Sequence, residues 1–169
     1  MSSKKGQIWS TDFLISAVVI TFIALMFILI WNGLAVRWNN AQEYRQMYVD
    51  AAFAADALLT TPGDPESWEN LETIDEDTVH ALGIVNSRNE INNMKMEKLV
   101  GLNDTEYAMV RQKLGITKYD VEIKVTDLSQ DSLYYYFGRT STMLETSIVL
   151  ERMALLNNTP VIVSIEVWK

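Results

Sequence analysis

The stretch FLISAVVITFIALMFILIW, residues 13 to 31, determines how the rest of the sequence is interpreted. It contains no charged side chain, and as a helix rising about 1.5 Å per residue it matches the hydrocarbon thickness of a bilayer, roughly 30 Å. Trp9 and Trp31 flank it, as aromatic residues do at the two membrane interfaces. The stretch therefore predicts a membrane-spanning helix.

Two other structures would explain an apolar N-terminal segment. A buried core helix would need apolar partners on every side, and a chain of 169 residues has too little material to surround this cylinder. A cleavable secretory signal would use Lys4 and Lys5 as its basic flank, but the apolar run is too long for one. Residues 32–35 also make a poor small-x-small cleavage site. We therefore favour a retained membrane span.

Most of the chain beyond this segment is acidic, and the whole chain lacks cysteine. The net charge is -8, and residues beyond Gly33 carry 12 basic and 21 acidic side chains. Nucleic acid is therefore disfavoured as a partner, because phosphate neutralisation needs clustered Lys and Arg. The absence of cysteine excludes disulfides, thiol catalysis and thiolate metal sites, and it leaves the cellular compartment open.

The hydrophobic pattern changes after Gly33. Residues 34–60 contain neither glycine nor proline and repeat apolar side chains at three- and four-residue steps, which predicts an amphipathic helix. The apolar and amphipathic halves together predict one long helix, with Gly33 as the expected position of any bend. The run TTPGDP, residues 60 to 65, predicts its end because proline removes a backbone donor and glycine permits a turn.

The remaining sequence predicts short helices followed by strands. Helices are expected over Asn89–Leu99, and from a cap at Asp104 or Thr105 to a C-terminal glycine at Gly115. Strands are expected over three β-rich runs, the last two joined as a hairpin: Tyr119–Thr126, Ser147–Leu155 and Val161–Trp168. We therefore expect an α+β fold, in which the long N-terminal helix packs on an antiparallel sheet of three or four strands.

The segment KKGQIWSTDF, residues 4 to 13, places a basic pair, a glycine, a short polar stretch and one acid before the apolar run. It resembles the class III signal peptide of archaeal type IV pilin-like proteins, in which a prepilin peptidase cuts after the glycine. The resemblance implies cleavage between Gly6 and Gln7, and subunit contacts at Asp12 and Phe13. In such assemblies the acid meets the freed amino terminus of a neighbouring subunit. The family usually has this acid at the fifth mature position and Asp12 would be the sixth, so the spacing is relaxed, or the cut is displaced or absent.

The resemblance implies a domain organisation and a function. Residues 1–6 would be a cytoplasmic leader, residues 7–33 a transmembrane and polymerisation helix, and residues 34–169 an extracellular domain. The expected function is a pilin-like or pseudopilin-like structural subunit of a cell-surface filament. Its partners would be the lipid membrane, copies of itself or related subunits, and a prepilin-type peptidase. The alternative is a single-pass membrane protein that never polymerises and carries an external binding or sensor domain, with Asp12 as an ordinary helix N-terminal acid.

No pattern in the sequence predicts an enzyme, a cofactor or a metal site. His80 is the sole histidine, so neither a hydrolytic triad nor a histidine-rich metal site can be assembled. The acidic run Asp75-Glu76-Asp77 lacks the spacing and the glycine of an EF-hand, which favours a solvated loop.

Two further patterns concern the surface of the domain. The aromatic run Tyr134–Phe137 predicts either a strand or loop folded onto the core or a contact surface for a neighbouring subunit or ligand, and the first is favoured. Asn103 and Asn157 begin N-x-T sequons and are candidate glycosylation sites in an exported domain.

Overall fold

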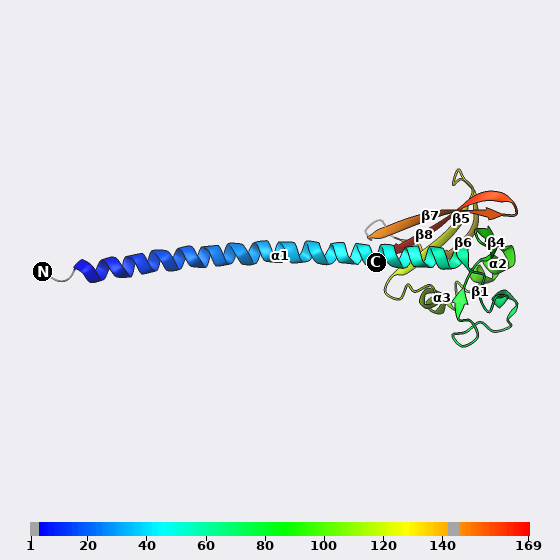
Figure 1. Ribbon diagram of the computed structural model, residues 1–169, viewed down its shortest axis with the longest axis horizontal. Helices are drawn as coiled ribbons and strands as arrows, with labels where there is room; N and C mark the ends of the chain where they lie inside the picture. The colour runs from blue at the N-terminus through cyan, green and yellow to red at the C-terminus, as the bar shows by residue number, and fades with distance from the viewer. Residues whose placement is uncertain (1–3, 142–145) are drawn as a thin grey trace. The chain divides into compact units, whose positions relative to one another are not determined.

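The computed structural model describes residues 4–141 and 146–169, with side chains described from Thr11 onward. The chain divides into two compact units, of which the first ends at Glu43 and the second runs from Tyr44 to Lys169. One helix, α1 (Lys4–Thr60), contributes residues to both units (Figure 1).

Helix α1 is continuous over 57 residues, which confirms the prediction of one long helix. Gly33, the expected position of any bend, lies inside α1, and the helix continues through it. The helix ends as predicted, at Thr60, because Pro62 has no backbone N–H and Gly63 follows with φ 99°.

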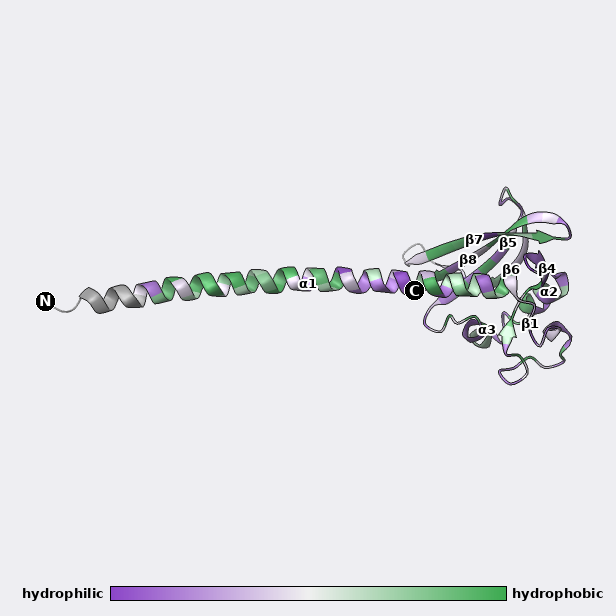
Figure 2. Cartoon of the chain, viewed as in Figure 1, coloured by the Kyte–Doolittle hydropathy of each residue, from purple (hydrophilic) through white to green (hydrophobic). Residues whose placement is uncertain are grey.

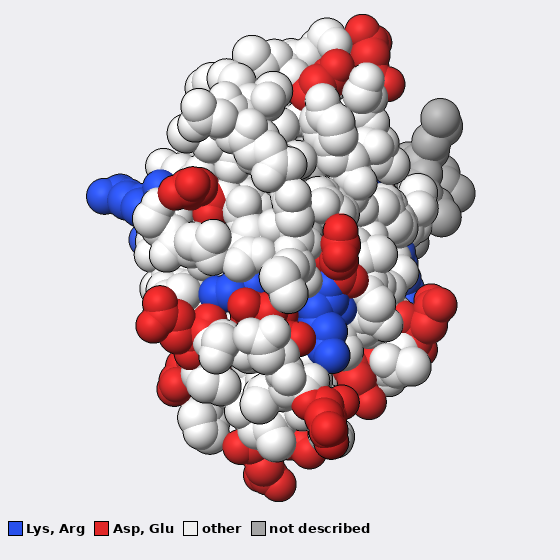
Figure 3. Space-filling view, turned by 90° about the vertical axis from the view of Figure 1, so that its right-hand side faces the viewer, with Lys and Arg blue, Asp and Glu red and all other residues white. Residues whose placement is uncertain are grey.

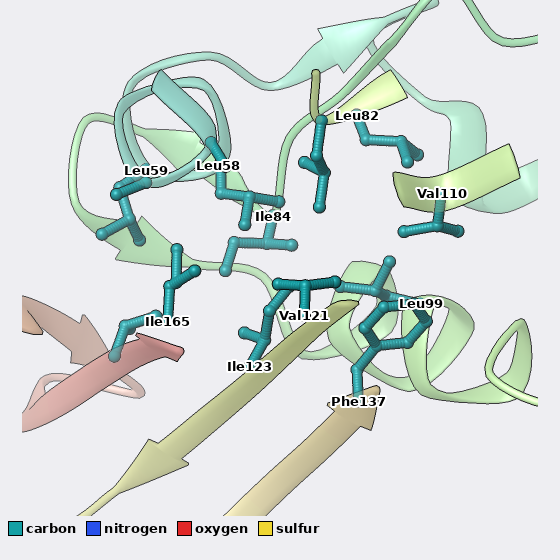
Figure 4. Close-up of a cluster of buried hydrophobic side chains, with 14 of the residues drawn as sticks. Leu58, Leu59, Leu82, Ile84, Leu99, Val110, Val121, Ile123, Phe137 and Ile165 are labelled. Carbon is teal, nitrogen blue, oxygen red and sulfur yellow. The ribbon is translucent and has the colours of Figure 1, made fainter. Parts of the chain in front are cut away.

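The hydrophobic core lies in the second unit, and α1 supplies one side of it. Six of its side chains there are buried, at one-, three- and four-residue steps: Met47, Ala51, Ala54, Ala55, Leu58 and Leu59. Three of these are alanines, whose small size lets the helix backbone pack close to its neighbours. In Figure 4, Leu58 and Leu59 belong to one cluster of side chains with Ile84, Val121 and Ile165.

The main sheet of the second unit has six strands, in the order β3-β4-β7-β8-β5-β6. Their bounds are β3 Val85–Ser87, β4 Glu90–Ile91, β5 Asp120–Thr126, β6 Leu133–Gly138, β7 Ser147–Leu156 and β8 Thr159–Trp168. The α+β class is therefore confirmed, although the sheet is larger than the three or four strands expected. It is also mixed, because β4 pairs with β7 in parallel while every other pair is antiparallel.

Shorter elements complete the second unit. They are β1 (Gly63–Asp64), which pairs with β2 (Ala81–Leu82), the 3-10 helix η1 (Trp68–Asn70), and the helices α2 (Asn93–Gly101) and α3 (Tyr107–Lys113).

The predicted strands are confirmed with small changes in their ends. In and beside β5, Tyr119, Val121, Ile123 and Val125 are all buried, as the alternating pattern predicts. Strands β7 and β8 form the predicted hairpin, and its two-residue turn holds Asn157 and Asn158 at φ 50° and 66°. Two consecutive positive φ angles are typical of a type I′ turn, whose twist matches that of the strands it joins.

Helix α2 begins four residues later than the sequence predicts. Residues 90 and 91 form β4 and pair with their neighbours in the sheet, which removes them from the helix. Asn92 then caps α2, because its Oδ1 accepts hydrogen bonds from the backbone nitrogens of Met94 at 2.8 Å and Lys95 at 3.3 Å.

The N-cap position of α3 is Glu106, whose side chain makes no capping hydrogen bond, so the predicted cap at Asp104 or Thr105 is wrong. Its end is as predicted. Gly115 has φ +78°, and its N–H donates to the carbonyl of Gln112 while that of Ile116 donates to Arg111. These two bonds form a Schellman motif, in which glycine adopts the left-handed conformation without strain.

Lys95 ties the loop after α1 to α2. Its side chain is 2% exposed, and Nζ donates to the carbonyl oxygens of Pro62 at 2.6 Å, Glu66 at 2.7 Å and Val85 at 3.3 Å. An ammonium group has three donors, and all three are used. Burial lowers the pKa of Lys95 below 10.5, against the opposing charges of Glu69 and Glu66.

Candidate functional site: the uncovered apolar helix

The apolar part of α1 is not covered by any described residue. From Thr11 to Gln42 every side chain is exposed except Ala17, which is partly covered. Figure 2 shows the run of hydrophobic residues along this part of the helix. α1 is long and apolar enough to cross a membrane, and none of its most apolar window is buried within the described structure.

The polar groups within this segment are compatible with a lipid environment. The Thr21 hydroxyl donates to the carbonyl oxygen of Ala17 at 2.8 Å, so its polar hydrogen is satisfied within the helix. Asp12 and Arg37 are the charged residues on either side of the uncharged residues 13–36. These two positions mark the outer limits of the segment that hydrocarbon can surround.

Aromatic side chains accompany the C-terminal limit of this segment. The rings of Phe27 and Trp31 stack with centroids 6.1 Å apart, and Trp38 lies two turns beyond Trp31 and is exposed. Tryptophan is enriched at membrane–water interfaces because it combines an apolar ring with one donor. The aromatic belt can therefore extend past Trp31 to Trp38.

The residues predicted for processing and subunit contact lie at the start of α1. Gly6 and Gln7 have helical backbone, and the side chain of Gln7 is not among those described. Asp12 and Phe13 are exposed, Phe13 by 73% of its surface. Cleavage between Gly6 and Gln7 and subunit contact at Asp12 and Phe13 stay predictions.

The acidic loop and the histidine form ordinary local structure. His80 is exposed, and its backbone N–H donates to the carbonyl of Asp64 at 2.8 Å. Asp75 accepts the backbone N–H groups of Asp77 and Thr78, and the bond from Thr78 is the main cause that lowers the pKa of Asp75 below 3.8. Among the described side chains, no three His, Asp or Glu residues are grouped as metal ligands.

The aromatic run Tyr134–Phe137 lies in β6 at the edge of the main sheet. Phe137 is fully buried, and its ring centroid lies 5.8 Å from that of Tyr107. The predicted strand on the core is therefore present, while Tyr134 remains exposed.

The two sequons differ in their surroundings. Asn103 is partly buried, and its Oδ1 accepts the backbone N–H of Gly138 at 2.8 Å. Asn157 is exposed in the β7–β8 turn, and its Oδ1 accepts from Asn93 Nδ2 at 3.1 Å. Asn157 is the more accessible of the two candidate glycosylation sites.

Sequence reasoning did not reveal a cavity in the second unit. It has a volume of about 300 Å³, and its lining comes from β6 and the β7–β8 hairpin: Tyr134, Tyr135, Leu156, Asn157, Thr159 and Val161. These residues are distant in sequence and share no motif, so only the sheet topology brings them together.

Charge is unevenly distributed over the molecular surface in Figure 3. On the face shown, Asp and Glu side chains are scattered from the edges to the middle, and fewer Lys and Arg side chains are visible. This distribution follows the composition of the chain beyond the apolar segment, where acidic residues outnumber basic ones.

Comparisons of the chain with protein-family models, with curated proteins and with solved structures gave no match.

Proposed function

We propose that the chain is a pilin-like structural subunit of a cell-surface filament, held in the membrane by α1 before assembly. The observation that carries the proposal is the division of one continuous helix into two parts. Residues 13–36 are uncharged and uncovered, whereas residues 47–59 bury an apolar face in the core of a folded domain. An apolar helix of this kind requires lipid before assembly and other apolar helices afterwards.

Asp12 adds support from physical chemistry. A carboxylate at the edge of the hydrocarbon is costly unless it is paired. Cleavage after Gly6 would create a positive amine at Gln7, and the amine of one subunit could neutralise the Asp12 carboxylate of the next. This pairing would favour assembly from the membrane without a charge being left in an apolar bundle.

The competing proposal is a single-pass membrane protein that does not polymerise and carries its second unit as an external binding or sensor domain. The uncovered apolar segment by itself fits both proposals, and its unbroken continuation into the core of the second unit is what favours the pilin-like one. The two differ in the fate of the N-terminus and in the need for Asp12.

The first experiment is mass spectrometry of the mature N-terminus in the native cell. We expect a chain that begins at Gln7 in cells that contain a prepilin-type peptidase. A Gly6→Val variant should remain uncleaved, whereas the matched Ser3→Ala variant should be processed normally. A native chain that begins at Met1 or Ser2 would argue against the pilin-like proposal.

The second experiment is electron microscopy of surface filaments from cells that carry Asp12→Asn. We expect this variant to enter the membrane normally and to lose filaments, because the amide cannot neutralise a neighbouring amine. Thr11→Ser is the matched control and should keep filaments. A processed wild-type chain that is absent from every surface filament would favour the competing single-pass proposal.

A further inference from the structure

The cavity beside β6 exists because neighbouring strands end at different levels. β5 ends at Thr126, whose partner in β8 is Ile162. β8 begins three residues earlier, at Thr159, and pairs there with Leu156 of β7. The hairpin therefore extends past the end of β5, and the space between the hairpin and β6 is left open.

A bulge in β6 turns two tyrosines toward this space. Val125 pairs with Tyr135 and Thr126 pairs with Leu133, so Tyr134 is the extra residue. Side chains of consecutive strand residues normally point to opposite faces, and a bulge changes this alternation. Both Tyr134 and Tyr135 consequently line the cavity.

The lining defines the chemistry of a ligand. None of the six lining residues carries a charge. Leu156 and Val161 are buried behind the cavity, Asn157 and Thr159 supply neutral donors and acceptors, and the tyrosine rings supply flat faces with polar tips. A volume of about 300 Å³ lies at the lower end of the range for small-molecule sites, roughly 300–1,000 Å³.

We propose that this cavity binds a neutral pyranose ring. Such a ring has hydroxyl groups around its edge for Thr159 and, where the saccharide is not linked to Asn157, for the Asn157 Nδ2 group, and it has C–H faces that complement the negative face of a tyrosine ring. A charged ligand would find no opposite charge in the lining, and a purely apolar one would leave the polar groups of the lining without partners.

The ring can come from two sources. One is a glycan linked to Asn157, which is itself part of the lining and begins the sequon Asn157-Asn158-Thr159. The Oδ1 of Asn157 is engaged by Asn93, and its Nδ2 makes no hydrogen bond within the described residues. The other source is a saccharide from outside the chain. The linked source rests on the proposed export of the second unit, and the external source does not.

The sources are distinguished by mass spectrometry of the peptide 153–169 from the full chain made in its native cells. If the peptide carries a glycan, Asn157→Asp removes it. The aspartate keeps a side-chain oxygen that can accept the hydrogen bond from Asn93, and aspartate tolerates the positive φ of this position. We expect this variant to lower the thermal midpoint by about 2 °C or more. Asn157→Asp also adds a negative charge. The effect of this charge on the thermal midpoint is measured by comparing the wild type and the variant, both made in a host without N-glycosylation.

The cavity is then tested by a second substitution. In a Tyr135→Leu background the loss of the glycan should no longer change the midpoint, because the stacking partner of the sugar is absent. Tyr136→Leu is the matched control, since Tyr136 belongs to the same strand and is not part of the lining. An equal effect of glycan loss in both backgrounds overturns the proposal.

If the peptide is unmodified, the full chain in detergent is studied by saturation-transfer NMR with methyl α-glucopyranoside and N-acetylglucosamine at millimolar concentration. We expect transfer to the ring protons of at least one of these probes, lost in Tyr135→Leu and kept in Tyr136→Leu. No transfer to either probe, or transfer that survives Tyr135→Leu, overturns the proposal. An uncleaved N-terminus would count against the pilin-like function and would leave these results unchanged.

Discussion

Tyr107 and Asp120 are joined by a hydrogen bond of 2.9 Å that ties α3 to the first residue of β5. The same phenol oxygen accepts the backbone N–H of Val121 at 3.0 Å, so the hydroxyl uses both its donor and an acceptor site. Arg111 also contacts Asp120 at 2.9 Å, and the Arg139 guanidinium lies 4.9 Å from the Tyr107 ring centroid. Burial is the main cause that raises the pKa of Tyr107 above 10.0.

Replacing Tyr107 by Phe should lower the free energy of unfolding by about 1–2 kcal/mol, because the Val121 N–H and one Asp120 oxygen each lose a partner. Urea unfolding of the full chain in detergent, followed by circular dichroism, measures this change. Tyr48→Phe is the control, since Tyr48 is exposed on α1 and should tolerate the loss of its hydroxyl. Equal midpoints for the two variants would contradict the assigned role of Tyr107.

Replacing Lys95 by Met should lower the free energy of unfolding by about 3 kcal/mol, because three backbone carbonyls lose a charged donor. Lys98→Met is the matched control, since Lys98 donates to a single carbonyl, that of Leu71, at 3.1 Å. We expect the control to lose less than about 1 kcal/mol in the same urea experiment. A Lys95→Met chain as stable as the control would show that the carbonyls find water instead.

Replacing Gly83 by Ala should destabilise the second unit by about 3 kcal/mol or more. A Cβ at this position would lie 1.9 Å from the backbone oxygen of Thr61, and backbone cannot move away as a side chain can. Gly101→Ala is the control, because a Cβ there meets nothing within 4 Å. We expect Gly101→Ala to unfold within about 1 kcal/mol of the wild type.

The acid sensitivity of the second unit should depend in part on Asp127. Its carboxylate accepts the N–H groups of Asp131 and Ser132 and the Ser129 hydroxyl, and the bond from Ser132 is the main cause that lowers the pKa of Asp127 below 3.8. In the unfolded chain this group binds its proton more readily. Its contribution is therefore present above pH 3.8 and is lost as the pH falls through the lower folded-state pKa.

Thermal unfolding between about pH 6 and pH 2 tests this assignment. Asp127→Asn should reduce the loss of thermal midpoint on acidification, because the amide does not titrate. Asp104→Asn is the control, and we expect the full wild-type loss, since the Asp104 carboxylate accepts no hydrogen bond from the described residues. An Asp127→Asn curve parallel to the wild type would contradict the prediction.

A lysine at Ile23 should impair membrane insertion of α1. Ile23 lies near the middle of the apolar stretch, where a Lys contributes about 2.5–3.5 kcal/mol against membrane insertion. Val36→Lys is the control because it lies beside Arg37, at the polar limit of the segment. Alkaline extraction of membranes measures the result, and we expect a larger share of the Ile23→Lys chain than of the control in the supernatant. Equal shares for the two chains would contradict the prediction.

The longer helices and strands could be predicted from the sequence, because their hydrophobic pattern repeats over many residues. The amphipathic part of α1, the alternation from Tyr119 to Val125 and the hairpin of the last two strands each carry a repeated or specific signal. Strands β1 to β4 have two or three residues each, which is too short for any alternation to be visible. The parallel pairing of β4 with β7 joins residues about 65 positions apart and depends on the whole topology.

The site was predicted in the same uneven way. The apolar segment follows from composition alone, whereas the cavity depends on where β5 ends relative to β8. The burial of Lys95 could not be predicted from the sequence either, because a lysine in a short amphipathic helix is expected to face water. Its three partners are backbone carbonyls, and backbone groups leave no trace in the side-chain pattern.

The position of Lys95 has a consequence for where the domain can fold. Small exported domains often stabilise a long loop with a disulfide, which forms only under oxidising conditions. Here an ammonium group joins three points of the chain between residues 62 and 85 to α2, and no cysteine is present. These hydrogen bonds require only that Lys95 is protonated, so they form without an oxidant and are not broken by thiols. The loop should therefore hold the same conformation in reducing and in oxidising surroundings.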